Sequence, residues 1–545
     1  MALGDKLRAL LRRRNEPKTI ISMHRERQVA VFSILLFMLL GLPLWWTTTR
    51  VYRADLPADS INRFAPGQTL AIPVVFYVDT DASLSAADTQ SIEQKVQSLV
   101  DSQRQQFAAG EWRTRYQAVV RAGAAPKTPG HYTIQLQTGS NATTVDMGPD
   151  RSMAIAVPQA TQAKGALIEA ISAIVSGEER SVRGLAPKRA ALKYAPEYAV
   201  TLTLLNEDPV GGAAVDWDVE QAVRAYLQPL VDELRPLTRL SISSQVLHHA
   251  GPPPVTPHRA HNVTYLTSDM LPHFINSPSW NFASIDPSSP MLNFVLFVPA
   301  LASQPMRIYN EQDIRRLDKG GSPPGKSAFV VSQWGGVSIA NLPQATRPGD
   351  KVVLSSADLQ QHMGYFISQL RRLIGIHGEA PKPGTSMSQV HVHPATKTGI
   401  SGWEYDALMR RWLVHNRQTA ITTLQSLVRL VDSLQSMVVM DEIKTQVDQA
   451  LHSLYAVDQA LSLTSNLDYS RAFASAASAA AFAESAFFDP SMVSMLYFPD
   501  QHKYAIYMPF FLPVAMPLLA AVKKIVAERK RTRAARAAKE PAKTE

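Results

Sequence analysis

Two closely spaced aspartates are the first residues in the chain that could do chemistry. Asp79 and Asp81 lie in VVFYVDTDAS (74–83), directly after the apolar run TLAIPVVFYV (69–78), which predicts a buried strand. Some glycosyltransferases use such a D-x-D to hold a divalent metal and a sugar-nucleotide diphosphate, because paired carboxylates suit a hard cation. Acidic and hydroxyl residues after a strand also form turns and cap the next helix. We favour the turn. The alternative function is a membrane-anchored glycosyltransferase of the endoplasmic reticulum (ER) lumen that holds a metal at this site.

Histidines are the second candidate, because an H-x-H on a strand turns both imidazoles to one face, as a zinc site requires. One group falls in the proline-rich stretch HHAGPPPVTPHRAH (248–261), and the H-x-H stretch is HVHP (391–394), which has no carboxylate spaced as a third ligand. We therefore predict exposed loop histidines, with no metal and no cofactor. The residues concerned are His248, His249, His258, His261, His391 and His393.

Other catalytic signatures are missing from the sequence. It contains no G-x-S-x-G, no G-x-x-x-x-G-K-[ST], no G-x-G-x-x-G and no H-E-x-x-H. It also has no cysteine, which excludes a thiol nucleophile, a thiolate metal site and any disulfide. We predict no catalytic, cofactor-binding or metal-binding residue, and a role in binding.

The segment 47–400 alternates apolar strand-like runs with amphipathic helix-like runs, which predicts an α/β body in one or two halves. The predicted strands are 69–78, 131–138, 152–158, 198–206, 239–247 and 292–299, and the predicted helices are 91–107, 166–177 and 218–234. Breaks rich in proline and glycine, such as 251–257 and 380–384, predict loops.

The segment 401–503 predicts a helical region. Leu424, Leu427, Val431, Leu434 and Val438 recur at three- and four-residue spacing, which predicts one apolar seam along a helix that breaks near Asp441. An intramolecular helical layer is favoured over an intermolecular coiled coil. The alanine- and serine-rich run 472–488 predicts a further helix that lets another backbone approach closely.

The positive charge of the chain is confined to its ends. Residues 1–27 have eight Lys/Arg against three acids and residues 523–545 have nine against three, so the ends carry a net +11 and the remainder −2, for a total of +9. A net positive charge that is confined to the two ends does not indicate that the central part of the chain binds nucleic acid. We predict two basic cytosolic tails, 1–28 and 523–545.

Each tail borders an apolar run. The run 29–46 has no charge and approaches the ~20 residues that a membrane-spanning helix needs, and Trp45 and Trp46 would lie at the membrane interface. No small-residue cleavage site follows it, which favours an uncleaved signal anchor over a signal peptide. The second apolar run, 504–522, contains three prolines at four-residue spacing: Pro509, Pro513 and Pro517.

These prolines deprive three carbonyls of their helical donors, a cost that lipid does not offset. We therefore expect 504–522 to pack inside a multi-helix assembly, with Pro509, Pro513 and Pro517 as the residues that meet a membrane partner, and not to stand alone as a kinked anchor. Two spans with cytosolic tails place 47–503 in a lumen. Two N-glycosylation sequons, Asn141 and Asn262, lie on that side.

Two stretches resemble the PIG-S family, a subunit family of the GPI transamidase of the ER. They are GLPLWWTTTRVYRADLP (41–57) and AFFDPSMVSMLYFPDQHKYAIYMPFFLPVAMPLL (486–519). LPHFINSPSW (271–280) and QWGGVSIAN (333–341) are similar more weakly. The order of parts also fits the family: tail, span, large lumenal body, span, tail.

The resemblance implies a function. It suggests a non-catalytic structural subunit that supports assembly of the complex and attachment of GPI anchors to the C-termini of precursor proteins, in the ER membrane. The partners it implies are the catalytic cysteine-protease-like subunit PIG-K, PIG-T, PIG-U and the metallopeptidase-like GPI-handling subunit, with membrane lipid and, in addition, GPI or the precursor as candidates. The expected fold is an α/β lumenal body followed by a helical region, flanked by one transmembrane helix at each end.

Overall fold

The computed structural model describes most of the chain and forms two compact units. The first, here called the α/β unit, consists of Ala58–Leu424 and Asp448–Glu484, and the second, here called the terminal unit, of Met1–Pro57, Gln425–Val447 and Ser485–Glu545. The described residues are 20–49, 52–64, 70–79, 86–105, 114–123, 125–182, 192–249, 257–260, 263–275, 280, 289–343, 346–376, 389–434, 437–462, 467–494 and 500–538.

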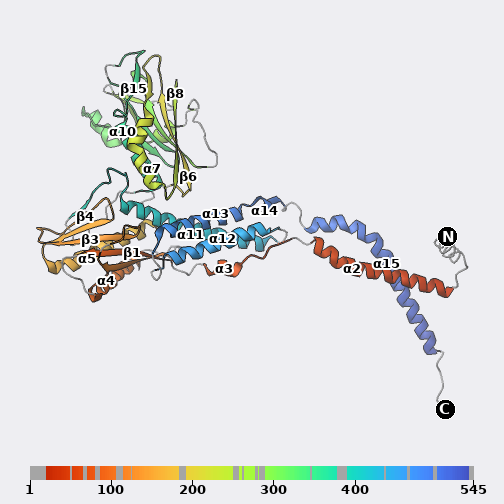
Figure 1. The fold of residues 1–545 in the computed structure, drawn as a ribbon. Helices are drawn as coiled ribbons and strands as arrows, with labels where there is room; N and C mark the ends of the chain where they lie inside the picture. The colour runs from red at the N-terminus through yellow and green to blue at the C-terminus, as the bar shows by residue number, and fades with distance from the viewer. Residues whose placement is uncertain are drawn as a thin grey trace, which may run out of the picture. The chain divides into compact units, whose positions relative to one another are not determined.

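The first sheet of the α/β unit has the strand order β16-β4-β5-β3-β1-β2. Its strands are β1 (Leu70–Asp79), β2 (Thr114–Ala122), β3 (His131–Thr138), β4 (Thr144–Met147), β5 (Ser152–Val157) and β16 (Gln389–Val392). β1 is buried almost throughout, as a central strand of a parallel sheet should be. Helices α4 (Ala86–Gln105) and α5 (Ala160–Val182) contact each other and the sheet (Figure 1).

The second sheet has the order β13-β14-β11-β6-β8. Its strands are β6 (Glu197–Asn206), β8 (Arg239–His248), β11 (Met291–Val298), β13 (Ala328–Val331) and β14 (Gly335–Ile339). Helix α10 (Gln360–Ile374) contacts β13 and β14, and α7 (Gln228–Leu234) contacts β8. The helix that leads into α7 contains a π-turn, Val223–Leu227, just before Pro229, a residue that cannot donate a helical hydrogen bond.

Shorter elements complete the second half of the α/β unit. β7 (Ala214–Trp217) pairs with β15 (Lys351–Leu354), and β9 (His258–Ala260), β10 (Val263–Leu266) and β12 (Met306–Ile308) form a small sheet. The remaining short helices are α6 (Val219–Ala222), α8 (Leu271–Phe274), α9 (Glu311–Asp318) and the single 3-10 turn Leu301–Ser303.

The two sheets share one topology. In chain order, β1, β2, β3, β4 and β5 of the first sheet correspond to β6, β8, β11, β13 and β14 of the second. In each, the second strand lies on one side of the first and the third on the other, all parallel, and a hairpin adds one antiparallel strand. The body therefore contains the same β-sheet plan twice.

The predicted α/β class is confirmed, and each of the six predicted strands and three predicted helices overlaps an observed element. β2, the hairpin β13–β14 and helix α10 were not predicted. The TRYQAVVRA run of β2 mixes charged and apolar residues, because it lies at the edge of its sheet, where one side meets solvent.

The described residues of the two weaker family stretches pack against the second sheet or belong to it. Phe274 and Trp280 pack edge-to-face with ring centroids 5.5 Å apart, and Phe274 also contacts Phe297 of β11. Gly335 has φ +148° and a Cβ there would lie 1.8 Å from the Asn293 carbonyl oxygen, so β14 can approach β11 only with glycine at this position.

The predicted helical region is observed as α11 (Gly402–Ser433), α12 (Asp441–Ala460), α13 (Tyr469–Phe487) and α14 (Pro490–Ser494), with α3 (Ala58–Arg63) preceding the first sheet. The apolar seam is wrong in its last two members. Leu434 and Val438 lie beyond the end of α11, in the connection to α12. This connection contacts residues 52–54, which no local pattern reveals.

Two long apolar helices belong to the terminal unit: α2 (Ile20–Thr49) and α15 (Asp500–Ala538). Within α15, the stretch Ala505–Ala534 is long and apolar enough to cross a membrane, the one such stretch that the described residues contain. Pro509, Pro513 and Pro517 lie inside this helix, as the sequence predicts.

Candidate functional site: the anchoring of helix α11

The predicted metal-binding aspartates are only partly described. Asp79 is the exposed last residue of β1 and stands opposite Gln135 of β3. Asp81 lies outside the described residues. The described part of the chain therefore presents one carboxylate at this strand end.

The predicted histidines that the structure describes are exposed, as expected, but His248, His258 and His391 lie on strands and not in loops. His248 ends β8, His249 follows with φ 56°, His258 begins β9, and His261 lies outside the described residues. His391 is on β16, and His393 Nε2 lies 4.0 Å from Asp146 Oδ1. Among the residues that the structure describes, no group of three His, Asp or Glu side chains could hold a metal ion.

The predicted modification site Asn141 is exposed in the turn between β3 and β4, whereas Asn262 lies outside the described residues. The backbones of Trp45 and Trp46 continue α2, and their side chains are outside the described part.

At the carboxyl end of the second sheet, polar side chains bond to the loops of the chain itself. In open α/β sheets, ligands commonly bind at the carboxyl ends of two neighbouring strands whose following connections run to opposite sides of the sheet. In the second sheet these two strands are β6 and β11. At that point the Glu207 carboxylate accepts a hydrogen bond of 2.8 Å from the Ala300 amide, and burial raises the pKa of Glu207. Beside it, Gln304 Nε2 donates to the Pro299 carbonyl at 2.7 Å. These polar groups hold loops together and are engaged within the chain.

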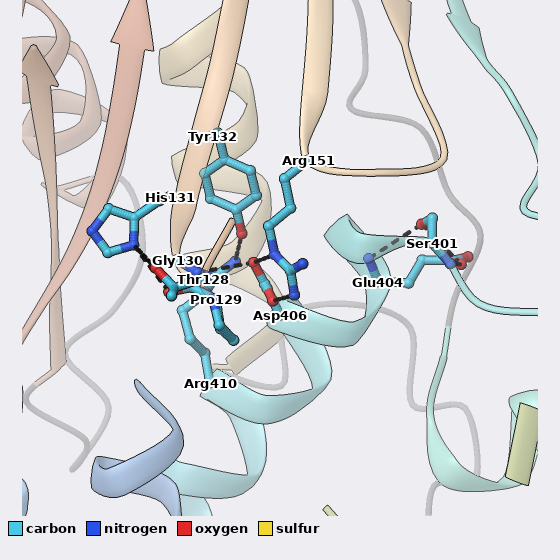
Figure 2. Close-up of polar contacts among 10 residues, drawn as sticks. All are labelled: Thr128, Pro129, Gly130, His131, Tyr132, Arg151, Ser401, Glu404, Asp406 and Arg410. Atoms are coloured by element: carbon cyan, nitrogen blue, oxygen red, sulfur yellow. Dashed lines mark hydrogen bonds and ion pairs between the residues drawn. The ribbon is translucent and has the colours of Figure 1, made fainter. Parts of the chain in front are cut away.

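The first turn of α11 carries a capping box. Ser401 precedes the helix, and its hydroxyl accepts from the Glu404 amide at 3.3 Å while the Glu404 carboxylate accepts from the Ser401 amide at 2.9 Å (Figure 2). The other oxygen of Glu404 accepts from Arg371 Nη2 of α10 at 2.6 Å. Arg371 also donates to the Gly399 carbonyl, so α10 of the second sheet is tied to the beginning of α11.

Asp406 ties the same helix to the first sheet. It is 1% exposed and accepts two hydrogen bonds from Arg151, Nε to Oδ2 at 2.8 Å and Nη2 to Oδ1 at 2.6 Å (Figure 2). The Gly130 amide, just before β3, donates to Oδ2 at 2.9 Å. A buried carboxylate is stable only when it is paired in this way.

Arg410 lies one turn further along α11 and is also 1% exposed. Its Nη2 donates to the Tyr132 hydroxyl of β3 at 2.7 Å, and its guanidinium lies 5.7 Å from the centres of the Tyr132 and Tyr469 rings (Figure 2). Trp403 stacks on the Tyr132 ring at 4.1 Å. Trp403 and Arg410 of α11 therefore both contact one tyrosine of β3.

In the terminal unit, the chain that leaves α2 binds the other end of α11. Arg53 donates to the carbonyls of Val431 and Leu434, where the last turn of the helix leaves acceptors unpaired. Ala54 and Tyr52 exchange backbone hydrogen bonds with Val439, and the Tyr52 hydroxyl donates to Asp441 Oδ1 at 2.8 Å. That bond to Asp441 raises the pKa of Tyr52. We call residues 52–54 the clasp.

These arrangements position elements and do not offer reactive groups. Asp406 and Arg410 are buried and engaged by Arg151 and Tyr132, and the clasp bonds through its backbone, the Arg53 guanidinium and the Tyr52 hydroxyl to groups of the same chain. Only parts of this site carried a sequence signal. The capping box SGWE (401–404) before an apolar run marks the start of α11, and Tyr52 and Arg53 fall in the strongest family stretch. The partners Arg151 and Arg371 are distant in sequence and were missed.

The helices α2 and α15 contact each other within the terminal unit. Arg27 of α2 and Glu528 of α15 form an ion pair of 2.5 Å. Apart from Glu528, the buried and partly buried residues of α15 recur along one face: Tyr507, Phe511, Ala515, Leu518, Ala521, Val522 and Ile525. Many other apolar side chains that the structure describes on the two helices are well exposed, for example Phe37 at 77% and Phe510 at 73%.

Comparisons with known proteins add independent findings. The family model PIG-S, described as phosphatidylinositol-glycan biosynthesis class S protein, matches residues 32–532. The chain is 30% identical to the GPI-anchor transamidase component PIGS of Bos taurus over 94% of this chain and 97% of that protein. The same values hold for the Homo sapiens component. A PIG-S homolog of Schizosaccharomyces pombe is 27% identical over 93% of this chain and 86% of its own length.

Proposed function

The chain belongs to the PIG-S family, and from this premise we propose that it is a non-catalytic structural subunit of a GPI transamidase in the ER membrane. It supports assembly of the complex and the attachment of GPI anchors to the C-termini of precursor proteins. The observation that carries the proposal is the extent of the match, residues 32–532, which includes the clasp, both sheets and most of α15. The relatives that match over nearly their whole length are named as components of this transamidase.

A structural role is supported by how the polar residues are used. The buried carboxylate of Asp406 on α11 bonds to Arg151 beside the first sheet. At the carboxyl end of the second sheet, Glu207 and Gln304 bond to backbone groups of the loop after β11. The chain has no cysteine, so the thiol of a cysteine-protease-like subunit must come from another polypeptide. We propose PIG-K as that partner, with PIG-T, PIG-U and the metallopeptidase-like GPI-handling subunit as the others.

A purification from membranes tests the subunit role. The tagged full-length chain is extracted in a mild detergent and the proteins that accompany it are identified by mass spectrometry. We expect a cysteine-protease-like subunit and several multi-span proteins to co-purify. Recovery of the chain as a clean monomer from cells that contain the other subunits would contradict the proposal.

We also propose that α2 and α15 both cross the membrane, with both termini cytosolic and the α/β unit lumenal. The Arg27–Glu528 pair supports this topology, because it joins the two helices at the basic end of each apolar run, as two antiparallel spans require. The exposed apolar side chains of both helices would then face lipid or partner helices.

The lack of native cysteine makes this topology directly measurable. Thr532→Cys lies on α15 beyond the apolar run, and Ser98→Cys is exposed on α4. In intact ER vesicles, a membrane-impermeant maleimide should label Thr532→Cys at once and Ser98→Cys only after detergent is added. The reverse order, or labelling of both before detergent, would exclude the two-pass topology.

A further inference from the structure

The three prolines of α15 lie on the side of the helix away from its contact with α2. The contact face runs through Tyr507, Phe511 and Leu518, whereas Pro509, Pro513 and Pro517 are all exposed. At 3.6 residues per turn, the prolines fall roughly 110–170° around the helix from the centre of the contact face. Helix α2 is therefore not the element that the prolines face.

This proline face also carries hydrogen-bond acceptors. A proline has no N–H, so the carbonyls of Ala505, Pro509 and Pro513 lack the donor four residues ahead. Ala505, Pro509 and Pro513 are themselves exposed, and they follow one another at one-turn spacing. The result is a row of three carbonyls on the exposed side of a helix whose neighbouring side chains, such as Ile506 and Met516, are apolar.

An acceptor in hydrocarbon needs a donor, and hydrocarbon has none. We propose that the proline face of α15 docks against a transmembrane helix of another subunit whose facing residues are hydrogen-bond donors, Ser, Thr, Tyr, Asn or Gln, at four-residue spacing. The proposal rests on the subunit role proposed above. It adds which face of α15 contacts the partner and which types of residue on the partner contact that face. The donors replace the missing amides, and the small ring of proline lets the partner backbone approach closely.

Two sets of substitutions separate hydrogen bonding from shape. Replacing Pro509, Pro513 and Pro517 with alanine restores the three N–H groups without adding bulk, and replacing them with leucine restores the N–H groups and adds bulk. Both triple variants should associate with the partner about 20-fold more weakly, the sum expected for three interhelical hydrogen bonds in a membrane. Met516→Ala removes bulk from the same face and leaves every backbone hydrogen bond in place, so it should change association by no more than about 3-fold.

The readout is the amount of each subunit that co-purifies with the full-length chain, with the Thr532→Cys labelling as the check on insertion. Alanine variants that insert and retain wild-type association would overturn the proposal. So would a loss seen with leucine and not with alanine, because that result assigns the face to steric fit. In either case the other subunits would still co-purify with the wild-type chain, so the subunit role would stand.

A photo-crosslinker identifies the occupant. A benzophenone amino acid at Met516, on the proline face, should capture another polypeptide, and the captured peptide should carry donor residues at four-residue spacing. Changing those donors to alanine or valine should weaken association without adding to the effect of the triple alanine variant. The same probe at Leu518, on the contact face, should instead link α15 to α2. Capture of lipid alone, or of α2 alone, at Met516 would overturn the inference.

Discussion

At the scale of single residues, the chain uses its buried charges to fasten one helix. Asp406 accepts three hydrogen bonds, two from Arg151 and one from the Gly130 amide, and these donors immediately precede β5 and β3 of the first sheet. Placing such a group inside a protein costs several kcal/mol, which good pairing roughly offsets. The arrangement therefore contributes little net stability and fixes where α11 begins relative to β3.

Removing one partner should be far more costly than the net value of the pair. Asp406→Ala leaves Arg151 and the Gly130 amide without their acceptor, so we expect the free energy of unfolding to fall by about 3–5 kcal/mol. Denaturant titration of the full-length protein in detergent measures this. Arg224→Ala, which removes an ion pair with Glu220 whose side chains are about three-quarters exposed, is the control and should change stability little. Equal effects of the two substitutions would refute the anchoring role.

At the scale of elements, the sequence predicts what local pattern determines. β1 and β6 are buried almost throughout and rich in apolar residues, as central strands of a parallel sheet are, which explains why the sequence predicts them. The end of α11 could not be predicted in this way. The stretch LVRLVDSLQSMVV (427–439) contains no proline or glycine that would mark the end of a helix. The helix ends where residues 52–54, which are distant in the sequence, bond to Leu434 and Val439.

In the candidate site, too, partners close in the sequence could be predicted and distant partners could not. The capping box at Ser401 and Glu404 could be read from sequence because both partners lie in one turn. Arg151 and Asp406 are 255 residues apart, and nothing local in either stretch marks them as partners. The metal and histidine hypotheses rested on short motifs, whose residues are either spread over strand ends or outside the described part of the chain.

The hairpin that closes the second sheet gives a test with a matched control. Gly335→Ala would place a Cβ 1.8 Å from a backbone oxygen of β11, so we expect loss of the folded second sheet or a destabilisation of several kcal/mol. Gly364→Ala lies in the exposed interior of α10 with nothing within 4 Å, and should stabilise the protein by about 0.5–1 kcal/mol. Thermal unfolding of both variants decides this, and a Gly335→Ala protein as stable as wild type would contradict the packing described here.

At the scale of the whole molecule, the chain combines an α/β unit with two long apolar helices near its ends, the arrangement expected of the membrane-complex subunit proposed above. The clasp begins three residues after α2 and engages the connection between α11 and α12. Near the start of α11, Glu404, Asp406 and Arg410 bond to Arg371 of α10, to Arg151 and to Tyr132 of β3. Both ends of α11 are therefore held by residues that are distant in the sequence.

The measurement that tests the central claim most directly is GPI attachment to a reporter precursor in membranes that lack their own PIG-S-family subunit. The account predicts no attachment without the chain, and equal restoration by the wild-type chain and by a double variant with Asp79→Ala and Asp81→Ala. Asp406→Ala should restore attachment only to the extent that folded chain assembles with the other subunits. The account would be contradicted if the double aspartate variant were folded and assembled yet inactive, because the chain would then supply chemistry of its own.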